Sequence, residues 1–184
     1  MDDLQQALET RRLLLEPLVA QHAAALFEAL QATELYVFIP QDPPASLQRL
    51  EERYLALASR TSPDGQEMWL NWVMRQRATG AYVGMVEASV HADRTATLAY
   101  MVFPPFWRQG FAKEACGRVV ASLFDEYRVS RIAAEIDTRN AASVHLVEAL
   151  GFARATVTSG ADFFKGSLSD EYRYERSAPE PAGT

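Results

Sequence analysis

The 184-residue chain is poor in the residues that build metal centres and covalent cross-links: it has one cysteine and three histidines. Cys116 alone cannot form an internal disulfide, and His22, His91 and His145 do not stand at the spacing of metal ligands. We therefore expect no metal site and no disulfide. Cys116 is predicted to be a buried structural thiol.

Long apolar runs and excess positive charge are also missing. No apolar run approaches the roughly 20 residues of a membrane span, and the amino terminus begins Met-Asp-Asp, acidic where a signal peptide is basic. A formal net charge of −6 disfavours binding to nucleic acid or to anionic membranes, whereas it tolerates cationic partners such as amines. The sequence therefore predicts a cytoplasmic protein with neither nucleic acid nor membrane as a partner.

The chain is long enough, at 184 residues and 48% hydrophobic, for one domain with a single sizeable core. Residues 1–176 are predicted to form that domain. Residues 177–184 have no hydrophobic anchor and are predicted to be a disordered tail.

The period of the apolar residues changes along the chain. A strand at 11–18, a helix at 20–30, an apolar loop at 35–44 and a helix at 46–58 are followed by segments of strand-like period. The remaining expected elements are strands at 68–74, 81–90 and 96–103, a helix at 109–127, a strand at 131–137, a helix at 141–150, and strands at 153–158 and 171–176. This order predicts a mixed sheet flanked by helices. Trp69 and Trp72 lie an odd number apart on one strand, which predicts one in the core and the other along a cleft.

The turn after the third strand of this series carries the clearest chemical signal. It reads Phe-Trp-Arg-Gln-Gly-Phe-Ala-Lys over residues 106–113 and opens a helix. The small residues Gly110 and Ala112 let backbone N–H groups approach an anion, and the helix amino terminus adds partial positive charge. Arg108 and Lys113 add full charges. The turn therefore suits a pyrophosphate, although a generic strand-to-helix turn has similar glycine spacing.

With this turn, the sequence resembles the GNAT acetyltransferases, and within them the RimJ/RimL-like (ribosomal-protein-alanine N-acetyltransferase-like) branch. Gly110 and Ala112 match the last fixed positions of the family pattern [Gln/Arg]-x-x-Gly-x-[Gly/Ala], and Trp107 occupies its first position. The resemblance continues through Asp-Thr-Arg-Asn-Ala-Ala-Ser at 137–143, Leu-Gly-Phe at 150–152 and Asp-Glu-Tyr at 170–172. These motifs occur in the family's order over nearly the whole chain.

The resemblance implies a GNAT fold of the mixed α/β (α+β) class, with a central, mostly antiparallel sheet splayed between two parallel strands and flanked by about four helices. Acetyl-CoA, the expected co-substrate, would lie in the opening between strands 96–103 and 131–137. The residues implied to hold it are the backbone of Met101, Val102 and Phe103, the turn residues Arg108, Gln109, Gly110, Phe111, Ala112 and Lys113, and the side chains of Asn140 and Ser143.

The resemblance also implies an acid and a base for acetyl transfer. Many family members use a tyrosine near the thioester sulfur, but Val147 occupies that position here, and Ser143 is its predicted substitute. An ordinary helix-start hydroxyl is the alternative for Ser143. Asp162 matches a carboxylate position of the branch and is the first candidate base; Glu87, acting through a water, is the second. Their alternatives are a loop carboxylate and a strand-surface charge.

The implied function is acetyl transfer from acetyl-CoA to a primary amine, most naturally a protein N-terminal α-amine. The alternatives that remain open are a small-molecule amine, an amino acid or an antibiotic as acceptor, and a non-catalytic acyl-CoA-binding regulatory module. Either a monomer or a homodimer is compatible with the sequence.

Overall fold

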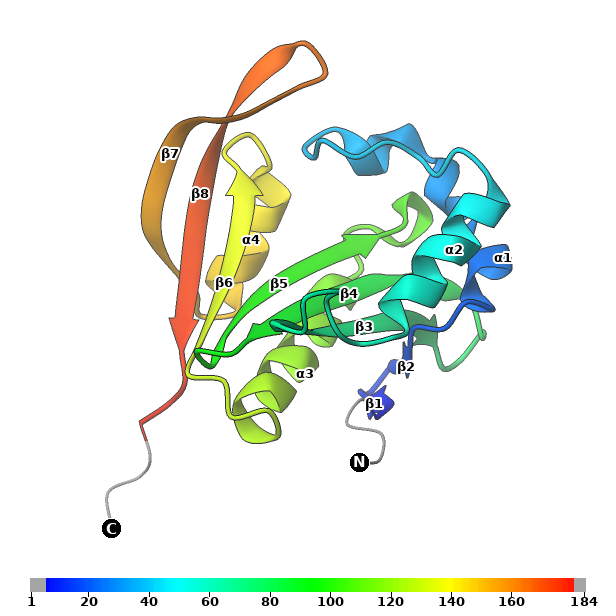
Figure 1. The fold of residues 1–184 in the computed structure, drawn as a ribbon, viewed down its shortest axis with the longest axis horizontal. Helices are drawn as coiled ribbons and strands as arrows, with labels where there is room; N and C mark the ends of the chain where they lie inside the picture. Colours follow the sequence, from blue (N-terminus) through cyan, green and yellow to red (C-terminus); the bar gives the residue numbers. More distant parts are fainter. Residues whose placement is uncertain (1–5, 181–184) are drawn as a thin grey trace.

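The computed structural model of the chain describes residues 6–180. Its strands form one eight-stranded sheet in the order β1-β2-β3-β4-β5-β6-β8-β7 (Figure 1). The strands are β1 Leu8–Glu9, β2 Leu13–Pro17, β3 Glu67–Gln76, β4 Tyr82–His91, β5 Thr95–Val102, β6 Arg131–Asp137, β7 Ala153–Phe164 and β8 Ser167–Ser177.

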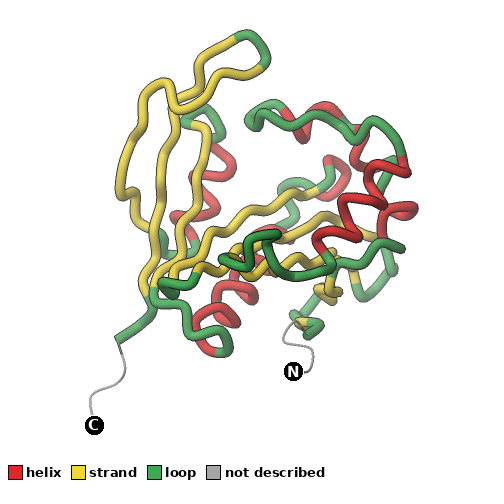
Figure 2. The backbone as a smooth tube through the Cα atoms, in the orientation of Figure 1, coloured by secondary structure: helices red, strands yellow, loops and turns green. Residues whose placement is uncertain are grey.

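One neighbouring pair in this sheet, β5 with β6, is parallel, and every other pair is antiparallel. The two parallel strands pair only where Thr95–Thr97 faces Arg131–Ala133, although β5 continues to Val102 and β6 to Asp137. Beyond that register the strands diverge, and the sheet opens into a V (Figures 1 and 2). The predicted mixed fold with splayed parallel strands is thus confirmed.

Helices cover both faces of the sheet. They are α1 His22–Leu26, α2 Leu47–Leu57, α3 Phe111–Asp125 and α4 Ala141–Ala149, with short 3₁₀ turns at Ala29–Gln31, Thr33–Tyr36 and Pro104–Phe106. One core cluster joins the sheet to α3 and α4, and a second joins its other face to α1 and α2. Side chains of β3 point alternately to the two faces of the sheet, so Trp72 packs in the first cluster and Val73 in the second.

The sequence of α3 shows why this segment is a helix. Phe111, Ala115, Val119 and Leu123 recur every four residues, and all are at most 2% exposed. Burying a large apolar side chain of this kind stabilises the fold by about 1.5–3 kcal/mol. Cys116, on the same buried side, is fully enclosed as predicted.

The largest differences from the predicted boundaries concern the first helix and the two terminal strands, and the two-residue strand β1 was not predicted. The first helix is shorter than 20–30, because after α1 the chain turns so that Leu30 and Tyr36 pack into the core, where the Tyr36 hydroxyl donates to the Leu30 carbonyl at 2.9 Å. Both terminal strands are longer than predicted, so that residues 159–164, expected to form a loop, belong to β7.

The first residues of the predicted tail are bonded to the rest of the chain. Ser177 is still in β8, and the Ala178 N–H donates to the Ser130 carbonyl at 2.9 Å; residues 181–184 of that tail lie outside the described residues. Within residues 6–180, no helix combines the length and the apolar character needed to cross a membrane.

Candidate acetyl-transfer site

The open edge of β5 lies where the sheet splays. The Phe103 N–H donates to the Val83 carbonyl of β4 at 2.9 Å. Because backbone groups alternate in direction along a strand, Met101 shares this orientation toward β4, while Tyr100 and Val102 direct theirs toward the opening. The Val102 carbonyl confirms this, since it accepts a hydrogen bond from the Trp107 indole Nε1 at 2.5 Å. Of the backbone contacts implied for Met101, Val102 and Phe103, the Val102 N–H is the one directed toward the opening.

A glycine on β4 lets the strands approach closely at this point. A Cβ on Gly84 would lie 2.1 Å from the Met101 carbonyl oxygen and 2.9 Å from the Val102 Cα. Both contacts are to backbone, so any side chain at this position would displace the end of β5. Gly84 therefore sets the position of the open edge.

The turn before α3 presents backbone donors and free cations. Gly110 caps the helix with φ +81°, and Arg108 also has a positive φ of 60°. Phe111 is buried, so only its backbone can face an anion. Arg108 and Lys113 are exposed and, within residues 6–180, make no hydrogen bond or ion pair. The turn thus offers unpaired helix N–H groups beside two cations, a combination that suits a pyrophosphate.

Arg12, near the amino terminus of the chain, contacts this turn and the first residues of α3. Arg12 Nε lies 2.6 Å from Glu114 Oε2, its Nη1 donates to the Gln109 carbonyl at 2.9 Å, and its guanidinium lies 4.5 Å from the centre of the Phe111 ring. Thr10 Oγ1 donates to Glu114 Oε1 at 2.7 Å. The sequence analysis missed this cluster, because no local pattern connects residues about a hundred positions apart.

The start of α4 holds Asn140 and Ser143. Asn140 Oδ1 accepts the Ser143 N–H at 3.1 Å, so Asn140 is the N-cap of α4. Its side-chain NH2 group remains for other contacts. Tyr100 donates to the Ser143 carbonyl at 3.4 Å; burial raises the pKa of Tyr100, and a hydrogen bond from the Ser143 side chain partly opposes this. The N-cap of α4 is therefore Asn140 and not Ser143. Val147 is fully buried in the core.

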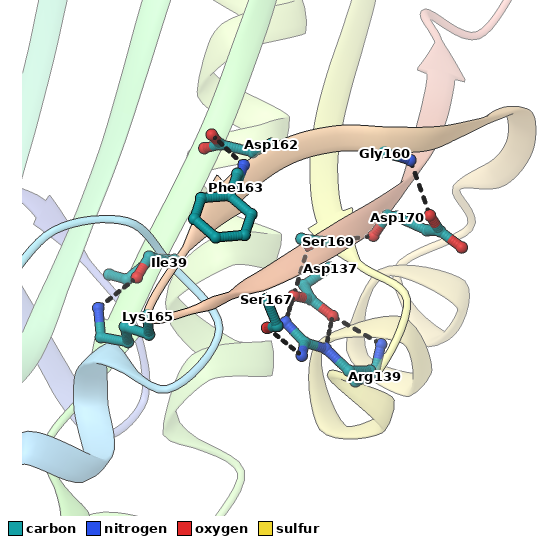
Figure 3. Close-up of polar contacts among 10 residues, drawn as sticks. All are labelled: Ile39, Asp137, Arg139, Gly160, Asp162, Phe163, Lys165, Ser167, Ser169 and Asp170. Carbon is teal, nitrogen blue, oxygen red and sulfur yellow. Dashed lines mark hydrogen bonds and ion pairs between the residues drawn. The ribbon is translucent and has the colours of Figure 1, made fainter.

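A carboxylate at the end of β6 fixes the chain that leads into α4 (Figure 3). Asp137 Oδ1 accepts from the backbone N–H and Nε of Arg139 at 2.8 and 2.9 Å, and its Oδ2 accepts from Arg139 Nη2 at 2.5 Å and from the Ser169 hydroxyl at 2.7 Å. Hydrogen bonding to Arg139 is the main cause that lowers the pKa of Asp137 to about 2, against the opposing effect of burial.

A cavity of about 350 Å³ lies on the face of the sheet covered by α2, bounded by β4, β5 and the loop before α2. Glu87 projects into it from β4, and its neighbour across the sheet is the small residue Ala99. Burial raises the pKa of Glu87, and the positive charge of Arg53 only partly opposes this. Glu87 also lines an adjoining cavity of about 130 Å³ together with Trp69, while Trp72 is fully buried. The opposite placement of the two tryptophans was predicted.

Asp162 has different surroundings. It is exposed on β7, opposite Ser169, and its Oδ1 accepts the N–H of the adjacent Phe163 at 2.7 Å (Figure 3). It lines neither of the cavities that contain Glu87. The structure does not bring the two candidate bases into one pocket.

The turn between β7 and β8 reaches across the opening to the loop before α2. Lys165 Nζ donates to the carbonyls of Ile39 and Gln41, at 2.9 Å each, and lies 3.6 Å from Asp42 Oδ1 (Figure 3). All three partners line the larger cavity. The hairpin therefore bridges the mouth of that cavity. No group of three or more His, Cys, Asp or Glu residues that could hold a metal ion occurs within residues 6–180.

Comparison with known proteins gives the class of protein. The model of the acetyltransferase (GNAT) domain matches residues 12–153. The chain is 26% identical over 174 residues to the uncharacterized N-acetyltransferase YoaA of Bacillus subtilis (strain 168), covering 94% of this chain and 97% of that protein. The chain therefore belongs to the GNAT acetyltransferases and is an acetyl-CoA-dependent N-acetyltransferase.

Solved structures agree on the fold. The ribosomal-protein-S5-alanine acetyltransferase of Vibrio fischeri superposes with a TM-score of 0.83 at 15% identity, over 96% of this chain and 98% of that one. The spermidine N-acetyltransferase of Vibrio cholerae, in complex with CoA and spermine, superposes with a TM-score of 0.78 at 20% identity, over 91% and 96%. The acceptors named for these proteins differ, so the acceptor of this chain has to be argued from its own pocket.

Proposed function

We propose that the chain transfers the acetyl group of acetyl-CoA to a primary α-amine, with Glu87 as the base. The observation that carries this proposal is the position of Glu87. It is a carboxylate with a raised pKa in a cavity that adjoins the splayed end of β5. A general base works best when its pKa lies near the working pH, and burial moves Glu87 in that direction. Asp162, the first candidate from the sequence, lines neither cavity.

The residues of the opening fit the co-substrate in our proposal. Its diphosphate would bind at the turn of Arg108 to Lys113, where Gly110 keeps the backbone accessible, and the amide of Asn140 would orient its arm. The bound thioester supplies an activated acetyl group. The Val102 N–H is directed toward the opening, which suits a donor to the acetyl carbonyl oxygen as negative charge develops there.

Proton transfer is assigned to two groups. Glu87, directly or through one water, accepts the proton of the attacking amine. On the other side of β5, the hydroxyl of Ser143, which lies beside the Tyr100 hydroxyl, donates a hydrogen bond toward the departing sulfur. Many family members have a tyrosine at the position of Val147 that protonates the sulfur. Val147 is buried and has no polar group in its side chain, so it cannot donate this proton.

An α-amine is favoured as acceptor by the energy of deprotonation. At pH 7, the N-terminal amine of a peptide, with a pKa of about 8, costs about 1.4 kcal/mol to deprotonate, whereas a lysine side chain costs about 4.6 kcal/mol. A single carboxylate base therefore suffices more easily for the α-amine. The RimJ/RimL-like motifs favour a protein N-terminus. The bridge from Lys165 across the cavity mouth favours the second candidate, a small-molecule α-amine, because it narrows the entrance.

The experiment is an acceptor screen with detection of released CoA thiol, covering small amines, amino acids and N-terminal peptides. A pH-rate profile of Glu87→Gln on one good acceptor then tests the base. Loss of a general base costs about 10²- to 10⁴-fold, so we expect kcat to fall about 100-fold at pH 7 and to recover partly at pH 9, where more amine is neutral. Asp162→Asn is the matched control and should keep the wild-type profile. A pH-dependent defect in Asp162→Asn, with Glu87→Gln unaffected, would show that the base lies on the hairpin.

A further inference from the structure

Among residues 6–180, one cation that lines the proposed acceptor cavity, Arg53, has no hydrogen-bond or ion-pair partner. Four charged side chains line the cavity: Asp42, Arg49, Arg53 and Glu87. Lys165 lies 3.6 Å from Asp42, and Glu52 accepts from Arg49 at 3.1 Å. Arg53, by contrast, forms neither a hydrogen bond nor an ion pair within residues 6–180.

The position of Arg53 directs its charge into the cavity. It lies one helical turn after Arg49 on α2, where it is exposed and lines the edge of the cavity beside the side of the helix that buries Leu50 and Tyr54. Its positive charge lowers the pKa values of Tyr36, Tyr54 and Glu87 against the larger effect of burial, and all three residues line the cavity from different elements. The guanidinium therefore lies above the same space into which Glu87 projects.

We propose that Arg53 binds the carboxylate of the acceptor, which makes this acceptor a compact, apolar α-amino acid. This inference rests on the proposed function, in which the acceptor amine reaches Glu87. A guanidinium binds a carboxylate through two parallel hydrogen bonds, and no described residue occupies these donors. A free amino acid carries both groups that the cavity asks for: an amine for Glu87 and a carboxylate for Arg53.

The remaining walls select the side chain and the size. Tyr36, Leu50 and Met85 line the cavity with apolar surface, which suits an aliphatic or aromatic side chain. The cavity holds about 350 Å³, and Lys165 bridges its mouth to Ile39. A polyamine would bring a further ammonium group close to Arg53, and the like charges would repel each other.

The reaction balances with these two substrates alone. The neutral amine nitrogen forms a bond to the acetyl carbon, and the carbon–sulfur bond breaks. The proton lost by nitrogen passes to Glu87, and the sulfur takes up one proton. The products are an N-acetyl amino acid and free CoA thiol.

The test uses acceptors that share a side chain and differ at the carboxylate, with rates expressed per neutral amine because the amines also differ in pKa. L-leucine, L-methionine and L-phenylalanine are each compared with their amides and with their decarboxylated amines, with CoA release as the readout. We expect kcat/KM to be at least tenfold higher for the best free amino acid than for its amide or amine. Arg53→Gln should reduce this ratio to near one, mainly by raising KM for the amino acid. Because Arg53 also acts on Glu87, the ratio is the quantity to compare: changes in Glu87 affect all acceptors alike and cancel.

Arg11→Gln is the matched control, at an exposed arginine that lines neither cavity, and its ratio should stay as in the wild type. Equal rates for the amino acid and its decarboxylated amine, or an equal loss for all acceptors in Arg53→Gln, would overturn the assignment of Arg53. If peptides are acetylated and no free amino acid is, the acceptor class is wrong while acetyl transfer stands. If acetyl-CoA binds but no amine in the wider screen is acetylated, the proposed function itself fails.

Discussion

Asp137→Asn tests how the opening of the sheet is held in place. Asp137 ends β6, and its carboxylate connects three segments: the turn at Arg139, the strand β8 at Ser169, and its own strand (Figure 3). The substitution keeps the shape of the side chain but removes the charge that the Arg139 guanidinium binds. One amide nitrogen would then face donors in place of an acceptor oxygen, leaving buried groups unsatisfied.

The pKa of Asp137 gives the magnitude. The difference between its ordinary value of 3.8 and about 2 in the fold corresponds to about 2.5 kcal/mol. Asp137 is 8% exposed, but the Arg139 side chain is 46% exposed and partly screened by water, so we expect a loss of about 2 kcal/mol at pH 7. The pKa is depressed in the folded state, so this stability is fully present above about pH 4 and is lost as the pH falls toward 2.

Urea unfolding at several pH values measures the effect. At pH 7 the midpoint should fall without a change in slope, and the melting temperature should drop by about 4–8 °C for a chain of this length. The difference from wild type should shrink between pH 4 and pH 2. Asp170→Asn is the control, because this exposed carboxylate accepts only the Gly160 N–H at 2.8 Å. A destabilisation of Asp137→Asn that is the same at pH 7 and pH 2.5 would refute the electrostatic reasoning.

Three further substitutions test the co-substrate side of the opening. Gly110→Val should weaken acetyl-CoA binding, measured by calorimetry. Because Gly110 has a φ of +81°, the substitution should also destabilise the fold by about 1–2 kcal/mol. An unchanged affinity for acetyl-CoA would show that the turn is not part of the site. Ser143→Ala should lower kcat more than it raises the dissociation constant of acetyl-CoA, and a wild-type rate would exclude its role at the sulfur. Arg12→Ala should weaken acetyl-CoA binding about tenfold, since Glu114 is left without its cation next to the proposed diphosphate site. The control Arg11→Ala, at an exposed neighbour, should bind acetyl-CoA with wild-type affinity. Equal affinities of the two variants would contradict the role of Arg12.

The elements with a buried stripe were the ones that the sequence predicted well. The strand at 131–137 has the predicted bounds, and the helix predicted at 109–127 is α3, Phe111–Asp125. β7 was predicted too short, because nearly all of its residues are exposed and no alternation of apolar and polar residues marks its course. β7 is an edge strand exposed on both faces, and backbone hydrogen bonds to β8 hold it in place. The pattern of side chains in the sequence cannot predict such backbone pairing.

The candidate site was predicted unevenly for a similar reason. The turn at Gly110 and the cap at Asn140 are local in sequence, so their residues could be named from motifs. Arg12, Arg53 and Lys165 reach their places through long-range contacts or through a helix face, and none of them stands in a motif. The order of the two candidate bases depended on resemblance alone, whereas the cavity around Glu87 is a property of the packed sheet.

The two faces of β5 explain how one strand serves two substrates in the proposed reaction. Tyr100 packs on the side of α3 and α4, where its hydroxyl reaches Ser143, and it also borders the cavity below α2 that Ala99 and Met101 line. Between them runs the open backbone edge, which neither set of side chains covers. Side chains on one face can therefore change with the acceptor while the contacts to the co-substrate remain.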